Sequence, residues 1–335
     1  MTRLGLKNNK LYGLQLLRAF AAISVCASHS ATEFLHKQSL KSIFDYGGYG
    51  VDLFFVLSGI VLWLSTRNAV PGLRSSKRFV LRRSIRIVPL YWSVTLALAL
   101  GILLFPTSFR SLSGGDGRLP LSLLFFPQQG PPLLIVGWSL TFEFFFYAFF
   151  ALGLLNKHMK IIAFSSLFGL GLIGLLFPDP TRGPWADLIF NSLHLEFILG
   201  MGAGWLYEKR RIPPVWASIA LVGLCLWLLV IRGDGHRALV CGGIGFGLVM
   251  AALVVEPRLG AIGRYGAVLG DASYDLYLIH LPLVVAMARL RGHFGLHSDY
   301  LGLIVSLVLA QAVALVCWKF FDQPIQRRLN ALLLV

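Results

Sequence analysis

Residues 49–65 read YGVDLFFVLSGIVLWLS and contain one charged side chain, that of Asp52. As an α-helix this run is about 26 Å long at 1.5 Å per residue. A helix of roughly 17 to 25 predominantly apolar residues crosses the hydrocarbon core of a bilayer. The stretch therefore predicts a membrane-spanning helix.

The composition of the whole chain agrees with that prediction. Of its 335 residues, 56% are hydrophobic and 13% are charged, whereas a soluble domain carries roughly 25% charged residues. The sequence lacks the alternating segments of about ten residues that indicate a membrane barrel. We predict an all-α polytopic membrane protein with about ten transmembrane helices, at residues 11–34, 49–65, 87–105, 133–155, 161–177, 188–207, 215–231, 238–255, 272–290 and 300–318.

The charges of the connections predict which side of the membrane each one faces. The chain holds 30 Lys and Arg against 15 Asp and Glu, a net charge of +15. With ten spans, twenty basic residues fall in the termini and the even-numbered connections, and nine fall in the opposite connections. The positive-inside rule then places both termini in the cytoplasm. It also explains the basic balance without a nucleic-acid partner.

The same counting gives a simple domain organisation. We expect one transmembrane domain over residues 1–335, with no appended soluble domain. The longest external connection, residues 106–132, carries the turn cluster SGGDG and could form a substrate mouth or a solvated linker. The four cysteines lie in apolar runs without CxxC spacing, so we expect neither disulfides nor a metal site.

Two polar residues of the first span are functional candidates, because charged groups within a span are costly. Arg18 and His29 are eleven residues apart, which places them within about 20° of one helix face and about 16 Å apart along the axis. A histidine can act as a general base near neutral pH, and a guanidinium can clamp a carboxylate or a phosphate. The alternative for His29 is a hydrogen bond to a neighbouring helix.

Two acidic residues have open interpretations. Asp52 could orient the imidazole of His29, or it could cap the start of its own helix. Glu143, in WSLTFEFFFY, is surrounded by aromatic residues and must pair or take a proton. Its partner could be Arg18, His29 or a basic residue of the third span.

Residues 77–92 read KRFVLRRSIRIVPLYW and form a basic cluster at the start of the third span. Arg82 and Arg86 share a helix face, with Arg83 beside them. The cluster suits a phosphorylated ligand that arrives from the cytoplasm. The alternative is an ordinary anchor to anionic membrane lipids.

Residues 271–282 read DASYDLYLIHLP and place several polar groups in the ninth span. We expect Asp271 to cap a helix. Tyr274 and Tyr277 could stack against a ligand or pack in the core. His280 is a second intramembrane imidazole and is a candidate for function.

Five segments together resemble the acyltransferase 3 family of bacterial membrane O-acyltransferases, and the likeness extends over most of the chain. In order they are LLRAFAAISVCASHS, GGYGVDLFFVLSGIVL, RRSIRIVPLYW, WSLTFEFFFY and SYDLYLIHLP. The sequence around LQLLRAFAA and RIVPLYW is most similar to that of the exopolysaccharide-production branch of this family, whose substrates are sugars. Many relatives have two adjacent acids after WSL, whereas here Glu143 is followed by Phe144.

The resemblance implies transfer of an acyl group, usually acetyl, from cytoplasmic acyl-CoA to a hydroxyl of a surface glycan or a lipid-linked sugar, across the bacterial inner membrane. It implies that His29 is the catalytic imidazole and that Arg18 is its companion. Arg83 and Arg86 would meet the CoA phosphates. The remaining matching segments contribute Glu143, Tyr147, Asp52 and Ser58.

Two other classes compete with this interpretation. An ion-coupled transporter or flippase would explain the intramembrane Arg18, Glu143 and His29, but not the basic cluster joined to one Arg–His stripe. A membrane glycosyltransferase would need an acidic pair for a metal-bound nucleotide sugar, and the sequence offers no obvious one.

Overall fold

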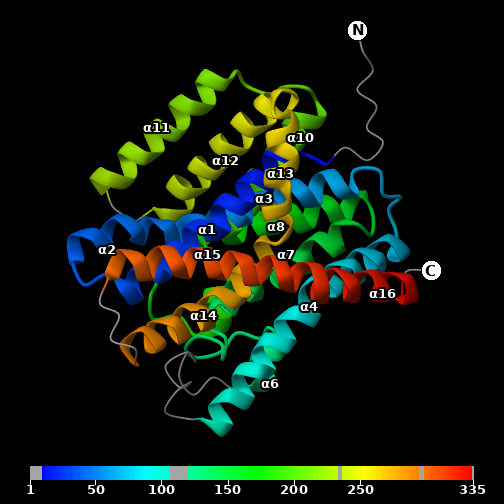
Figure 1. Cartoon of the computed structure of the whole chain (residues 1–335). Coiled ribbons are helices and arrows are strands. Elements are labelled where there is room, and N and C mark those ends of the chain that lie inside the picture. Colours follow the sequence, from blue (N-terminus) through cyan, green and yellow to red (C-terminus); the bar gives the residue numbers. More distant parts are fainter. Residues whose placement is uncertain (1–9, 106–118, 233–235, 294–297, 334–335) are drawn as a thin grey trace.

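All regular elements of the described chain are helices. The computed structural model describes residues 10–105, 119–232, 236–293 and 298–333, and the all-α prediction is confirmed over these ranges (Figure 1). The sixth predicted span, residues 188–207, contains a non-helical break at residues 190–193, and each of the ten overlaps a long helix. These are α1 (Tyr12–Phe34), α3 (Gly50–Thr66), α4 (Leu73–Leu104), α7 (Trp138–Gly153), α8 (Lys157–Leu176), α10 (His194–Glu208), α11 (Val215–Arg232), α12 (Arg237–Val255), α14 (Ser273–His293) and α15 (Asp299–Cys317).

Short helical elements join or extend these ten. They are α2 (Gln38–Asp45), η1 (Tyr46–Tyr49), α6 (Leu119–Leu123), η3 (Ile135–Gly137), α9 (Pro184–Ile189), η4 (Glu256–Arg258), α13 (Gly260–Asp271), the π-helical η5 (Trp318–Asp322) and α16 (Gln323–Leu333). The predicted turn cluster at residues 113–117 lies outside the described residues.

Within the described ranges, six helical segments are long and apolar enough to cross a membrane, and the bent pair of α13 and α14 is a seventh candidate. These two helices meet at an angle of 52°. The shorter α11 is apolar as well. The remaining two are α10, which has only 15 residues, and α1, which carries Arg18. The count of ten spans and the side of the termini stay predictions.

The surface of the bundle carries large apolar side chains. Leu103 is 77% exposed, Val230 is 75% exposed and Trp216 is 70% exposed. A soluble protein rarely exposes contiguous apolar surface on this scale, whereas lipid is the appropriate solvent for it. The chain is therefore a multi-pass membrane protein.

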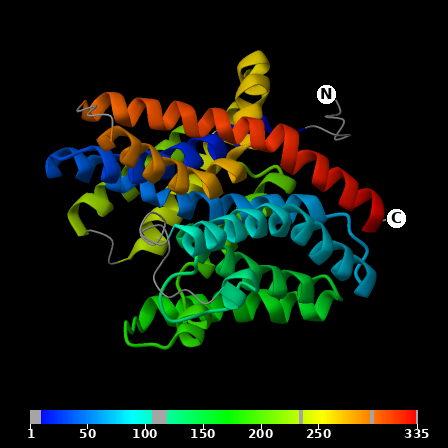
Figure 2. The same cartoon turned by 60° about the horizontal axis from the view of Figure 1, so that its bottom comes forward.

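Helix α1 occupies the centre of the bundle. It contacts α3, α12, α13, α14 and α15. Figure 2 shows α14 to α16 on one side of the molecule and α7 and α8 on the other, with α1, α3 and α4 between them. Side chains of α1 can therefore meet groups from several other helices.

Two glycines allow α3 and α10 to pack with their backbones in contact. A Cβ atom at Gly59 would lie 2.2 Å from the carbonyl oxygen of Phe197, and one at Gly200 would lie 2.0 Å from that of Val56. Small residues permit such close packing of membrane helices. The contact fixes α3 in position, and with it Ser58, the neighbour of Gly59.

Candidate active site

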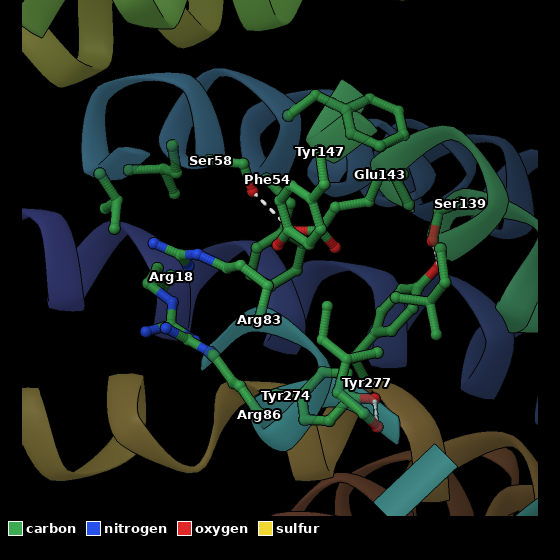
Figure 3. A pocket seen from close by; sticks show the side chains of 16 residues that line it. Arg18, Phe54, Ser58, Arg83, Arg86, Ser139, Glu143, Tyr147, Tyr274 and Tyr277 are labelled. Carbon is green, nitrogen blue, oxygen red and sulfur yellow. Dashed lines mark hydrogen bonds between the residues drawn. The ribbon is translucent and has the colours of Figure 1, made fainter. Parts of the chain in front are cut away.

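A cavity opens between α1, α3, α4, α7 and α14, with a volume of about 80 Å³. Its wall joins polar side chains from all five helices to an apolar lining (Figure 3). The polar lining residues are Arg18, Ser58, Arg83, Arg86, Ser139, Glu143, Tyr147, Tyr274 and Tyr277. Segments that the sequence analysis singled out on separate helices thus meet at one site.

Three arginines gather at one end of the cavity (Figure 3). The guanidinium of Arg83 lies 5.7 Å from the ring centre of Tyr147 and 5.8 Å from that of Phe79. Arg18 interacts electrostatically with both Arg86 and Arg83. Like charges are thus held together, at an electrostatic cost that an anionic ligand would remove.

The structure does not bring Arg82 into this group. Its side chain is exposed, and the cavity is lined by Arg83 and Arg86. Around the helix, Arg86 lies between Arg82 and Arg83. Arg86 therefore reaches the cavity together with Arg83, whereas Arg82 lies on the far side of Arg86 and does not.

Glu143 lies at the middle of the cavity wall and has two hydroxyl partners. Ser58 donates a hydrogen bond to its Oε1 atom at 3.1 Å, and the Tyr147 hydroxyl, one helical turn along α7, donates to the same atom. Glu143 also interacts electrostatically with Arg18 and Arg83. Arg18, one of the partners considered for Glu143, and Arg83 of the basic cluster thus contribute positive charge. The hydrogen bonds come from Ser58 and Tyr147, which were not considered.

The opposite end of the cavity is formed by tyrosines of α14 (Figure 3). The Tyr274 hydroxyl donates to the carbonyl oxygen of Ile87 at 2.8 Å. The Tyr277 hydroxyl donates to the carbonyl oxygen of Val136 and lies 2.8 Å from Ser139 Oγ. These hydrogen bonds hold both tyrosine side chains in place in the cavity wall.

His29 and His280 form a pair between α1 and α14. The Nε2 atom of His280 lies 3.0 Å from Nδ1 of His29, and the ring centres are 5.1 Å apart. His280 is fully buried. The hydrogen bond to a neighbouring helix that was an alternative for His29 is present, and its partner is the second candidate imidazole.

Hydrogen bonds to backbone carbonyls assign the protons of the neutral rings. His280 Nδ1 lies 3.0 Å from the Leu276 oxygen, and His29 Nδ1 lies 3.1 Å from the Val25 oxygen. A carbonyl oxygen only accepts, so in the neutral rings both Nδ1 atoms carry a proton, and the single Nδ1 proton of His29 is shared between the Val25 oxygen and His280 Nε2. This leaves the Nε2 atom of His29 with an unshared electron pair.

The histidine pair lies beyond the tyrosine end of the cavity. His29 is not part of the cavity wall. The ring of Tyr277 lies 6.2 Å from that of His280 and 5.9 Å from that of Phe54. Both aromatic side chains line the cavity, and Tyr277 connects it to the histidine pair.

Asp52 has a partner that sequence analysis did not identify. Both of its oxygens accept hydrogen bonds at 2.8 Å from Arg237 of α12. The buried Glu196 lies close enough to interact electrostatically with Asp52 and Arg237. Pairing with Arg237 was not among the roles considered for Asp52, which lies in the first turn of α3, as expected of an acidic residue at a helix start.

Other residues also differ from their expected roles. Asp271 lies at the end of α13 and accepts a hydrogen bond from Lys10, so it is not the expected helix cap. Ser139 is a cavity residue that sequence analysis missed, and its position directly after Trp138 in the WSL segment was the available signal.

The chemistry of the cavity favours an anionic ligand. Its charged lining consists of three guanidinium groups and one carboxylate, and guanidinium binds phosphate through forked hydrogen bonds. In the described part of the chain, no cluster of three or more His, Cys, Asp or Glu could hold a metal ion.

Comparison with known proteins gives the class of the enzyme. A family model described as an acyltransferase domain matches residues 11–319, so this protein is an acyltransferase. The matched range contains the arginine-lined cavity and both histidines. The chain belongs to the acyltransferase 3 family, as the five sequence segments indicated.

Individual relatives have related names. The exopolysaccharide production protein ExoZ of Rhizobium meliloti is 30% identical over 303 residues, covering 85% of this chain and 91% of that protein. The acyltransferase MdmB of Streptomyces mycarofaciens is 37% identical over 320 residues, covering 84% of this chain and 81% of that protein. The peptidoglycan O-acetyltransferase OatA of Listeria monocytogenes is 25% identical, covering 80% of this chain and 48% of its own length. No solved structure matches the chain significantly.

Proposed function

We propose that this protein transfers an acyl group, usually acetyl, from cytoplasmic acyl-CoA to a hydroxyl of an extracytoplasmic or lipid-linked glycan at the bacterial inner membrane. The observation that carries the proposal is the excess of guanidinium groups in the cavity, combined with an available imidazole nitrogen further along the same helix. The relatives named for exopolysaccharide production and for peptidoglycan O-acetylation support a glycan acceptor.

The arginines account for binding of the donor. CoA is too polar to enter lipid, so its phosphates remain at Arg83, Arg86 and Arg18. Its thin pantetheine arm extends along the cavity past Glu143 towards Tyr277. Arg18 and His29 are about 16 Å apart along α1, so binding at the arginines directs the thioester towards the imidazole.

His29 accounts for the chemistry. Its Nε2 atom removes the proton from the acceptor hydroxyl while the oxygen attacks the thioester carbonyl. The carbon–sulfur bond breaks, an ester forms, and the CoA thiolate takes the proton from the imidazolium. In the alternative order, Nε2 first attacks the thioester carbonyl and the CoA thiolate leaves, so that His29 carries the acyl group as an acyl-imidazolium. The acceptor hydroxyl then attacks this group, the carbon–nitrogen bond breaks, and the CoA thiolate takes the hydroxyl proton.

His280 is a positioning residue in this scheme. Its Nε2 atom accepts the Nδ1 proton of His29 at 3.0 Å, which keeps the lone pair of His29 on Nε2. The hydrogen bond also stabilises positive charge on His29 during proton transfer, because a hydrogen bond from a charged donor is stronger. This is the orienting role that a carboxylate performs in other catalytic systems.

Replacement of His29 tests the reaction. The His29→Ala variant should bind acyl-CoA normally, yet turn over roughly 10² to 10⁴ times more slowly. Binding is measured on purified protein in detergent, and turnover as labelled acetyl transferred to the glycan of a strain that lacks the gene. If the acyl-imidazole forms, wild-type protein incubated with labelled acetyl-CoA alone retains label, and the variant does not.

Two outcomes would overturn the proposal. A folded His29→Ala variant with normal turnover would exclude both roles of His29. A wild-type protein that binds no acyl-CoA and leaves the O-acyl content of the surface glycan unchanged would exclude the acyl-CoA and glycan assignments. The remaining hypothesis would then be an ion-coupled transporter or flippase. Such a protein would move its substrate across the membrane without changing the acyl content of that substrate.

A further inference from the structure

A second hollow lies between the segment that follows α6 and the short helix α9. It consists of two adjoining cavities of about 710 and 190 Å³, which share Phe126, Gln128 and two prolines. We call this hollow the aromatic groove. It lies apart from the arginine-lined cavity and has no role in donor binding as proposed above.

Two large aromatic side chains are exposed at the groove. Phe126 is 45% exposed and Trp185 is 55% exposed, and their ring centres are 5.8 Å apart. Both rings present apolar faces at a site that also carries hydrogen-bonding groups. Such faces stack against the C–H groups of a sugar ring, which are the apolar part of a carbohydrate.

Several contacts hold the loop that carries Phe126. Phe125 has a φ of 57°, a strained value for a residue other than glycine. Its ring stacks on Phe144 with ring centres 4.1 Å apart. Ser122 accepts hydrogen bonds from the Leu133 backbone and from the Gln128 amide. Anchoring of Phe125 inside the protein forces Phe126 outward, so the aromatic face is preorganised for a ligand.

The polar lining of the groove suits hydroxyl groups and not phosphates. It contains Gln128, Gln129, Thr141 and Asp187, and among the described lining residues there is no lysine or arginine. Amide side chains both donate and accept hydrogen bonds, as a polyol requires. A phosphorylated lipid headgroup would instead call for a basic residue.

Adjacent residues in the first turn of α7 line the groove and the donor cavity. Trp138 lines the groove, and the next residue, Ser139, lines the cavity and contacts Tyr277. Tyr277 in turn lies beside His280, the partner of His29. A chain held in the groove is therefore positioned next to the route that the thioester takes.

We infer that the aromatic groove binds a neutral sugar unit of the acceptor glycan, stacked on Trp185 and Phe126 and hydrogen-bonded by Gln129 and Asp187. This inference rests on the proposed acyltransferase function and adds the site where the acceptor is held. Binding remote from the reacting hydroxyl places that hydroxyl for attack.

Kinetics with a defined acceptor test the inference. The probe is surface glycan purified from a host strain that lacks the gene, with labelled acetyl-CoA as donor. Trp185→Ala should raise KM for the glycan about tenfold, with kcat and KM for acetyl-CoA unchanged, because one stacking face is lost. Trp185→Phe should stay within about threefold of wild type, because a ring remains.

Two further variants separate a glycan from lipid. Trp227 is 58% exposed on α11, away from the groove, and is the matched control for an interfacial anchor. Trp227→Ala should leave KM for the glycan unchanged. Gln129→Ala should raise it by about threefold to tenfold, the loss of one hydrogen bond.

The results distinguish the two proposals. If the wild type transfers acetyl to glycan but Trp185→Ala and Gln129→Ala both keep a normal KM, the groove inference is wrong and the function stands. Equal losses in Trp185→Ala and Trp227→Ala would make Trp185 a lipid anchor. If the wild type transfers no acetyl at all, the proposed function itself fails.

Discussion

Two groups of charged residues lie within the helix bundle, and their charges are balanced in opposite ways. The cavity collects Arg18, Arg83 and Arg86 around one carboxylate, that of Glu143. The second group sets Asp52 and Glu196 around one guanidinium, that of Arg237. Asp52 is completely buried and both of its oxygens are paired, whereas the cavity arginines face open space.

The difference separates a scaffold from a binding site. A buried ion pair that satisfies itself costs desolvation and gains fixed geometry, and the Asp52 pair joins the start of α3 to the start of α12. The gathered arginines lack such compensation, and under the proposed function the phosphates of the donor supply the missing negative charge. The predictions below ask whether the two groups separate in this way.

The largest effect is expected in the cavity. The double variant Arg83→Glu with Arg86→Glu should weaken acyl-CoA binding roughly 100-fold or more, because each lost charge-assisted hydrogen bond costs about 1.5 to 3 kcal/mol. Isothermal titration of the purified protein with a nonhydrolysable acyl-CoA measures this. The melting temperature should change little, because both side chains are only partly buried. Unchanged affinity would instead make the arginines a lipid anchor.

A smaller effect, on stability alone, is expected in the second group. Arg237→Met leaves the carboxylate of Asp52 without its cation, at a cost of about 3 kcal/mol. The value is at the low end for a buried pair because the Arg237 side chain is 36% exposed. Thermal denaturation in detergent measures it, and Arg237→Lys should recover part of the loss. A stable Arg237→Met protein without acyl transfer would break the comparison, since the pair would then belong to the reaction.

The smallest effect is expected next to the cavity. Arg82 is adjacent to Arg83 in sequence but is exposed and points away from the lining. Arg82→Glu should change acyl-CoA affinity by less than about threefold, as expected for an exposed charge in screened solvent. The same titration measures it, and a loss as large as that of the double variant would show that affinity depends on net surface charge and not on the cavity.

Helical periodicity predicted the relations that lie within one helix. The eleven-residue spacing of Arg18 and His29 placed them on one face, and α1 is a continuous helix over both. The hydrogen bond between Tyr147 and Glu143 was not predicted, although it follows the same rule, since the two are four residues apart. Such pairs need no knowledge of the tertiary fold.

Contacts between helices were not predictable in this way. Asp52 and Arg237 are 185 residues apart, and His29 and His280 are 251 residues apart. Hydropathy gives the positions of the spans but not their order around the bundle. A single sequence therefore identified His29, His280 and Asp52 as candidates and could not say which two would meet.

Span counting met a physical limit as well. Each of the ten predicted spans overlaps a helix, yet α10 has 15 residues and is too short to cross a membrane alone at 1.5 Å per residue. The charge of Arg18 lowers the mean hydropathy of α1, although this helix packs against α3, α12, α13, α14 and α15. Hydropathy identifies helices whose side chains are apolar enough to face lipid. It is less suited to helices such as α1 and α10, which pack mainly against other helices.

The continuity of α1 has one consequence for the choice of donor. Arg18 and His29 lie on one unbroken helix, so the distance between the guanidinium that binds phosphate and the imidazole is constant. Under the proposed function, the thioester must sit one pantetheine length from its phosphates. Truncated donors such as acyl-N-acetylcysteamine would then lack the anchor, and binding energy from the distant nucleotide would no longer position their carbonyl. The enzyme would select its donor by length, whatever the acyl group at its end.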